Sequence, residues 1–216
     1  MTISRLRMAS DGAGVSTLVA FYGCPLQCRY CANWICHDED TERKYYSPEN
    51  LVSILSQDDI YFKTTGGGIV FGGGEPLLSA EFIHEVCELA DPLWKRRIET
   101  SLYADWERIN LLVGDIDEWF IDIKDLQPKI YTKYAGKDND IVLSNLKKLI
   151  AIVPKEQVMI RVPLIANFNT ADDVKQSVTK LKSMGFSRID EFEYVVPLGV
   201  TTKQGDYNAS GRYEFE

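Results

Sequence analysis

Residues 16–31 read STLVAFYGCPLQCRYC, and they decide the fold prediction because they join a buried strand to a loop rich in cysteine. The first part, Ser16–Tyr22, is apolar, β-branched or aromatic over the length of one strand, as is typical of a strand buried in a parallel sheet. Gly23 follows the strand, and three cysteines then appear with the spacing CxxxCxxC. We therefore expect a functional loop at the carboxyl end of a buried strand.

Five similar runs follow along the chain and alternate with segments of helical spacing. The predicted strands are Ser16–Tyr22, Gly68–Phe71, Arg97–Leu102, Glu118–Lys124, Val158–Ile165 and Glu191–Pro197. The predicted helices are Pro48–Ser56, Ala80–Leu89, Trp106–Val113, Asp140–Ile152 and Ala171–Met184. This alternation predicts an α/β fold of parallel βαβ units. Because six units are fewer than the eight of a closed barrel, we expect an open, partial (β/α)6 TIM-like barrel with its site at the strand carboxyl ends.

The 216 residues fit one domain, and no linker or internal repeat divides them. We expect a single domain over residues 1–216, with a core at about 14–199 and a short tail at 200–216. No apolar run approaches the ~18–20 residues of a membrane span, and residues 1–14 lack the apolar core of a signal peptide. A cytoplasmic protein without membrane contact is therefore expected. The net charge of −8 argues against a nucleic-acid partner.

Four of the five cysteines lie within residues 24–36. An odd number of thiols in an unexported chain favours a metal site over disulfide bonds. Cys24, Cys28 and Cys31 are the expected ligands, and three thiolates would leave one iron of a cluster open, whereas ferredoxins supply four per cluster. A zinc site completed by Cys36 and His37 is the alternative.

The CxxxCxxC motif, with Tyr30 directly before its last cysteine, resembles the signature of the radical S-adenosylmethionine enzymes. The resemblance implies a [4Fe–4S] cluster on the three cysteines and S-adenosylmethionine chelating the fourth iron. It also implies reductive cleavage of the sulfonium to a 5′-deoxyadenosyl radical, chemistry that belongs to the cofactors. Tyr30 would pack against the adenine, or it is an ordinary core tyrosine.

Residues 71–77, FGGGEPL, resemble the second motif of that family. Gly73 and Gly74 would let the backbone approach a ligand closely, and Glu75 would accept hydrogen bonds from the methionine ammonium group. A tight loop without a ligand is the simpler interpretation of such glycines. Because residues 71–77 follow the CxxxCxxC motif at a distance in sequence similar to that in the family, we favour a ligand-binding role for this motif.

Further blocks resemble the glycyl-radical-enzyme activases of the pyruvate formate-lyase type. They are residues 122–125, Tyr131, residues 134–136, residues 143–146 and residues 160–165. The resemblance implies that Glu99, Thr100 and Asp122 lie near a monovalent cation. It also implies that Lys124 and Arg161 contact S-adenosylmethionine. An ordinary ion-pair network among these side chains is the alternative.

The chain departs from the activase pattern in three places. Residues 194–199 contain no histidine where the activases usually carry one, and Tyr131 stands near the place of a second. Only Cys36 and Cys87 remain outside the motif, so a second cluster is excluded by the cysteine count. Cys87 has the spacing of a buried helical residue and is expected to be structural.

Three functions are compatible with these patterns. The first is an anaerobic oxidoreductase that installs a radical on a glycine of a partner glycyl radical enzyme, acting as a monomer reduced by flavodoxin or ferredoxin. The second is a radical enzyme acting on a ribosomal peptide or a small metabolite, because fold alone does not select a substrate. The third is a non-enzymatic iron–sulfur or zinc redox sensor.

Overall fold

The computed structural model describes residues 1–8 and 11–195 of the chain. The strands are β1 (Thr2–Met8), β2 (Val15–Phe21), β3 (Gly68–Gly73), β4 (Lys95–Thr100), β5 (Glu118–Asp122), β6 (Val158–Leu164) and β7 (Ile189–Glu193). The α-helices are α1 (Pro48–Leu55), α2 (Asp59–Thr65), α3 (Ala80–Leu89), α4 (Trp106–Leu112), α5 (Pro128–Ala135), α6 (Asp140–Ile152) and α7 (Ala171–Ser183). Short 3₁₀ turns are η1 (Trp34–His37), η2 (Ser56–Asp58), η3 (Pro76–Ser79) and η4 (Lys155–Gln157). The predicted tail at 200–216 and the end of the last predicted strand lie outside the described residues.

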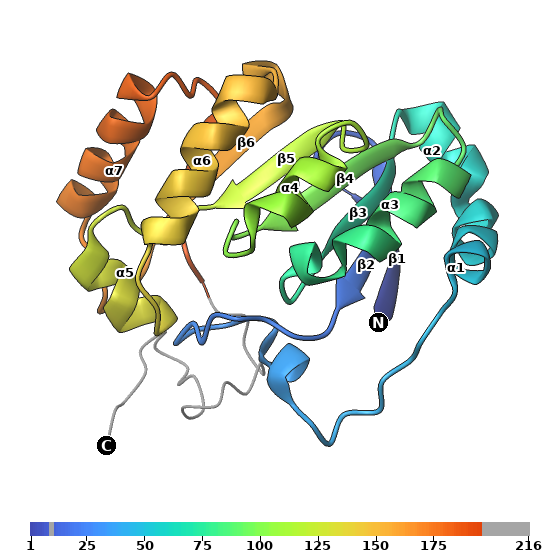
Figure 1. Cartoon of the computed structure of the whole chain (residues 1–216), viewed down its shortest axis with the longest axis horizontal. Coiled ribbons are helices and arrows are strands. Elements are labelled where there is room, and N and C mark those ends of the chain that lie inside the picture. The colour runs from blue at the N-terminus through green and yellow to red at the C-terminus, as the bar shows by residue number, and fades with distance from the viewer. Residues whose placement is uncertain (9–10, 196–216) are drawn as a thin grey trace.

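The strands form one sheet in the order β1-β2-β3-β4-β5-β6-β7. All pairings from β2 to β7 are parallel, which confirms the partial (β/α)6 barrel. Helices α3, α4 and α6 lie across one face of this sheet (Figure 1). The curved sheet therefore keeps its other face for the interior of the barrel.

The sequence prediction missed β1, which pairs antiparallel with β2 before the barrel begins. Its sequence TISRLRM carries two arginines and is mostly exposed, so it lacks the apolar run that identifies a buried strand. A register shift between Ser4 and Arg7 also interrupts its pairing with β2. The sequence prediction also missed the helices α2 and α5.

Two helix starts that the sequence predicted are formed by side-chain caps. The Ser47 hydroxyl accepts a hydrogen bond from the Asn50 backbone N–H at 3.2 Å, and Pro48 is the first residue of α1. At α7, Thr170 and Asp173 form a reciprocal capping box. These caps fix where each helix follows its loop at the rim of the barrel.

The two faces of each strand have different chemistry. On β5, Trp119 and Ile121 are fully buried in the apolar core. The alternate residues Phe120 and Asp122 face the interior, where the Arg161 guanidinium lies 5.7 Å from the Phe120 ring. The barrel interior is therefore polar near the strand carboxyl ends.

A second polar layer lies at the opposite end of the barrel. The Arg97 side chain is 2% exposed, and its guanidinium donates to the Glu118 carboxylate at 2.8 Å and to the Ala13 carbonyl at 2.8 Å. Near it, Asp11 accepts hydrogen bonds from the Arg7 guanidinium and from the Ser16 hydroxyl. This layer fills the bottom of the barrel and leaves the carboxyl end as its mouth.

Among residues 1–8 and 11–195, none of the helices combines the length and the apolar character that crossing a lipid bilayer demands.

Candidate active site

The cysteine loop, residues 23–33, crosses the mouth of the barrel from the end of β2 to α5 (Figure 1). Backbone hydrogen bonds hold it at both sides. The Gly23 N–H donates to the Cys36 carbonyl at 2.9 Å, while the N–H groups of Gln27 and Arg29 donate to the carbonyls of residues 135 and 134, each at 2.9 Å. The loop is therefore a strap fixed to elements far apart in the sequence.

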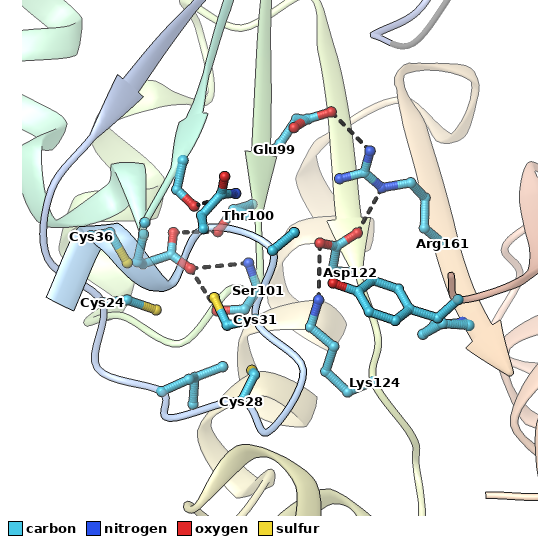
Figure 2. Close-up of a pocket in the computed structure, with 18 of the residues that line it drawn as sticks. Cys24, Cys28, Cys31, Cys36, Glu99, Thr100, Ser101, Asp122, Lys124 and Arg161 are labelled. Carbon is cyan, nitrogen blue, oxygen red and sulfur yellow. Dashed lines mark hydrogen bonds and ion pairs between the residues drawn. The ribbon is translucent and has the colours of Figure 1, made fainter. Parts of the chain in front are cut away.

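A cavity of about 270 Å³ lies under this strap. It is lined by Cys24, Leu26, Cys28, Cys31, Ala32, Asn33, Cys36, Gly73, Gly74, Glu75, Glu99, Thr100, Ser101, Asp122, Lys124, Tyr134, Arg161, Pro163, Phe192 and Tyr194. Every residue that the sequence predicted for the site is among them, with the single exception of Tyr30. Figure 2 shows the cysteines on one side of the cavity and the charged residues of β4, β5 and β6 on the other.

Tyr30 lies in an aromatic group instead of lining the cavity. Its side chain is 3% exposed, and its ring meets the rings of Tyr134 and Phe168 edge-on, with centroids 6.3 and 5.2 Å away. The Asn167 side-chain amide donates to the Tyr30 hydroxyl at 3.3 Å. This geometry matches the core tyrosine, and the predicted contact with an adenine remains untested.

Glu75 is buried at the end of β3 with both carboxylate oxygens in hydrogen bonds. Oε1 accepts from the Thr100 hydroxyl at 2.6 Å and from the Leu77 N–H at 3.3 Å, and Oε2 accepts from the Ser101 N–H at 3.0 Å and hydroxyl at 2.5 Å. Burial raises the pKa of Glu75, and these bonds oppose the rise. A carboxylate offers about four acceptor positions, so the predicted contact with a ligand amine requires one of these bonds to yield.

Gly73 and Gly74 bring the end of β3 against the start of the cysteine loop. Gly73 has a φ of +94°, which favours glycine. At Gly74 an added Cβ would lie 2.2 Å from the Gly23 carbonyl oxygen. The Glu75 N–H also donates to the Gly23 carbonyl at 2.9 Å, so the two motifs are joined directly by backbone contacts.

Four charged side chains form one network across the cavity (Figure 2). The Arg161 guanidinium donates to Asp122 Oδ1 at 2.6 Å and to Glu99 Oε1 at 2.8 Å, and the Lys124 ammonium donates to Asp122 Oδ2 at 3.0 Å. Burial raises the pKa of Asp122, but Lys124 and Arg161 outweigh it and hold that pKa at about 2. Burial also raises the pKa of Glu99. Its single guanidinium partner, Arg161, lowers that pKa by less than burial raises it, so the pKa stays above its ordinary value. The ion pairs that the sequence allowed as an alternative are thus present.

The chemistry of the donor set fits an iron–sulfur cluster. Three thiols approach one cavity from the strap, and no group of three or more Cys, His, Asp or Glu side chains in the described part of the chain is placed to hold one metal ion. Thiolates on a cluster bind separate irons and so need not meet at one point, unlike the ligands of a structural zinc.

The thiols themselves differ in acidity. Burial raises the pKa of Cys24 to about 12 and that of Cys28 to about 11, while a hydrogen bond with Cys36 lowers the pKa of Cys31 to about 7. Bound iron would favour the thiolate form of all three.

Sequence reasoning missed several residues that line the cavity. Ser101 is identified only by its contacts with Glu75, and Asn33 by its side-chain N–H bond to the Gly73 carbonyl at 3.0 Å. Tyr194 also lines the cavity, and no local sequence pattern predicts that it belongs to the site. Cys87 is 3% exposed, as expected for a structural thiol.

Comparisons with known proteins agree with this site. The family model described as Radical SAM superfamily matches residues 18–181. The 4-hydroxyphenylacetate decarboxylase activating enzyme of Clostridioides difficile (strain 630) is 27% identical over 272 residues, covering 93% of this chain and 84% of that protein. The (2S)-3-sulfopropanediol dehydratase activating enzyme of Klebsiella oxytoca is 30% identical over 182 residues, covering 78% and 56%.

The fold is also found in a solved structure. Streptococcus suis SuiB bound to S-adenosylmethionine superposes with a TM-score of 0.65 at 17% identity. The match covers 84% of this chain and 41% of SuiB, so the chain spans about two fifths of that protein's length. At this identity the likeness concerns the fold.

Proposed function

Because the chain belongs to the radical SAM superfamily, we propose that it is an activating enzyme that generates a radical on a glycine of a partner glycyl radical enzyme. The observation that carries the proposal is the cavity in which three cysteines of the strap face a carboxylate, lysine and arginine network at the barrel mouth. The likeness to two activating enzymes supports it over most of the chain.

Cys24, Cys28 and Cys31 would hold a [4Fe–4S] cluster, with one iron left for S-adenosylmethionine. When bound, the cluster supplies the single electron that splits S-adenosylmethionine into methionine and the 5′-deoxyadenosyl radical, which removes a hydrogen atom from the partner's glycine. The protein residues bind and orient the reactants and exclude water from the cavity.

We assign the methionine carboxylate to Lys124 and Arg161. Both are cations at the cavity wall, and each already donates to Asp122. An incoming carboxylate would compete with Asp122 for their N–H groups. Glu99, Thr100 and Asp122 supply oxygen atoms for a monovalent cation, whose charge would compensate Asp122 and Glu99 when their pairs with the two basic residues weaken.

Glu75 would act by fixing Thr100 and Ser101. Its oxygens accept four hydrogen bonds from the protein, so it holds the end of β4 and the start of the following loop in place. Gly73 and Gly74 would admit the methionine backbone, and Tyr30 would support the adenine side of the loop. The electron donor in this proposal is a reduced flavodoxin or ferredoxin, and the enzyme works as a monomer in an anaerobic cytoplasm.

Anaerobic reconstitution tests the cofactor chemistry. The purified chain is loaded with iron and sulfide, reduced with dithionite and supplied with S-adenosylmethionine, and iron content and 5′-deoxyadenosine are measured. We expect about four irons per chain and steady release of the nucleoside. Cys31→Ala is the negative variant, and Cys87→Ala is the matched control for loss of a thiol away from the cavity.

A second assay tests the substrate. A candidate glycyl radical enzyme from the same organism is mixed with the reduced, loaded protein, and electron paramagnetic resonance is used to look for its glycyl radical. Release of 5′-deoxyadenosine without a glycyl radical in any candidate partner would reject the activase and leave a radical enzyme with another substrate. One zinc and no nucleoside would reject both.

A further inference from the structure

The barrel is open on one side, and the cysteine strap reaches across to that side. Within the described residues β7 pairs with β6 and has no strand on its other edge. The chain leaving β7 nevertheless continues the ladder by one residue, because the Tyr194 N–H donates to the Leu164 carbonyl at 2.9 Å. Tyr194 therefore lies at the mouth, directly after β7 on the open edge.

The Tyr194 hydroxyl is bonded to the backbone directly before the third cysteine. It donates to the Tyr30 carbonyl at 2.7 Å, across 164 residues of sequence. Because this carbonyl belongs to the peptide group that joins Tyr30 to Cys31, the phenol fixes one of the two peptide groups that determine where the Cys31 side chain points.

The surroundings of Tyr30 make this attachment rigid. Its ring is enclosed by Tyr134 of α5 and Phe168 of the loop after β6, whose own centroids lie 5.1 Å apart. Edge-to-face aromatic contacts of this kind add to the area that the rings bury. Packing of its ring therefore fixes Tyr30, and the Tyr194 hydroxyl donates to the carbonyl of this fixed residue.

The other two cysteines are held differently. Cys24 follows Gly23, whose N–H is bonded to the Cys36 carbonyl, and Cys28 lies between Gln27 and Arg29, whose N–H groups are bonded to the end of α5. Those contacts are backbone to backbone. At the third cysteine the attachment comes from a side chain of the open edge.

We infer that Tyr194 is a positioning residue for the third cluster ligand: its hydroxyl couples the open edge of the barrel to the peptide group that precedes Cys31. The inference rests on the cluster of the proposed function and not on the identity of the substrate. Loss of the hydroxyl is then expected to loosen the strap at Cys31 and to weaken retention of the cluster.

The variant Tyr194→Phe tests this with the loss of a single oxygen atom. Tyr131→Phe is the matched control, since the Tyr131 ring is fully buried and its hydroxyl has no hydrogen-bond partner among the described residues. Both proteins are reconstituted, and the rate of iron release to bathophenanthroline disulfonate is measured without oxygen. We expect about tenfold faster iron release from Tyr194→Phe, because the loss of one hydrogen bond at the upper end of the usual net strength changes an equilibrium about tenfold. The control should change less than twofold.

Two further readouts separate positioning from general loss of stability. Hydrogen exchange of the strap peptide carrying the Arg29 amide, which donates to the Tyr134 carbonyl at 2.9 Å, is expected to quicken about tenfold in loaded Tyr194→Phe, while peptides of α3 are unchanged. The resonance spectrum of the reduced cluster is expected to broaden or shift in the same variant.

Equal iron release in the two variants, or equally slow exchange of the Arg29 amide in both, would overturn the inference. If Tyr194→Phe does not fold, the wild-type protein decides: rapid exchange of the Arg29 amide in the loaded chain overturns the inference, and slow exchange supports it. Failure of the activase assay would leave these rates untouched, so the two failures are distinguishable.

Discussion

Replacing Asp122 with asparagine tests whether the charge network at the barrel mouth stabilises the fold. Asp122 pairs with both Lys124 and Arg161, at 3.0 and 2.6 Å. Lowering the pKa of a carboxyl from 3.8 to about 2 corresponds to ~2.5 kcal/mol of folding free energy, at about 1.4 kcal/mol per pKa unit. Since 27% of the side chain is exposed to the cavity, we expect Asp122→Asn to lower the free energy of unfolding by ~2 kcal/mol.

The pH dependence gives this prediction its sign. The pKa of Asp122 is lower in the folded chain, so its contribution is present above the unfolded value near 4 and is lost as the pH falls through about 2. Urea unfolding of the cluster-free protein at pH 7 and pH 5 should therefore show the same difference between wild type and Asp122→Asn. A difference that is absent at pH 7, or that disappears between pH 7 and pH 5, would refute the argument.

Other substitutions are expected to act as follows. Alanine at any of the three cluster cysteines abolishes both bound iron and 5′-deoxyadenosine formation, whereas Cys87→Ala keeps both, as iron assay and chromatography would reveal. Thr100→Val removes the hydroxyl that donates to buried Glu75 and lowers the free energy of unfolding by ~1–3 kcal/mol; an unchanged urea midpoint would contradict the importance of that bond. Thr170→Ala removes the capping box with Asp173 and costs ~1 kcal/mol in the same assay, without changing iron content.

The barrel and most of its site could be predicted from the sequence because their signals are local. Buried parallel strands are continuous apolar runs, and the cysteine motif lies within eight residues of Gly23. The edge strand β1 could not be predicted this way, since its residues are mostly exposed and its partner is β2 alone among the described strands. An edge strand is identified by its neighbour instead of by its composition.

The contacts within the site show the same division. Glu75 was found from its glycine-rich motif, but its bonds to Thr100 and Ser101 join residues 25 and 26 positions away. Tyr30 lies inside the cysteine motif, whereas Tyr194, 164 residues further on, belongs to no local sequence motif. The spacing of residues in the sequence identifies the candidate ligand-binding residues. Only the three-dimensional structure shows which distant residues position them.

The Arg97 and Glu118 layer at the bottom of the barrel has a consequence for any macromolecular substrate. Gly12 packs against this arginine so closely that an added Cβ would lie 2.9 Å from its Nε atom, and the guanidinium is sealed from solvent. A polypeptide substrate therefore cannot be threaded through the base along the barrel axis, and a segment that presents its target atom here reaches the cavity from the mouth or from the open side of the barrel.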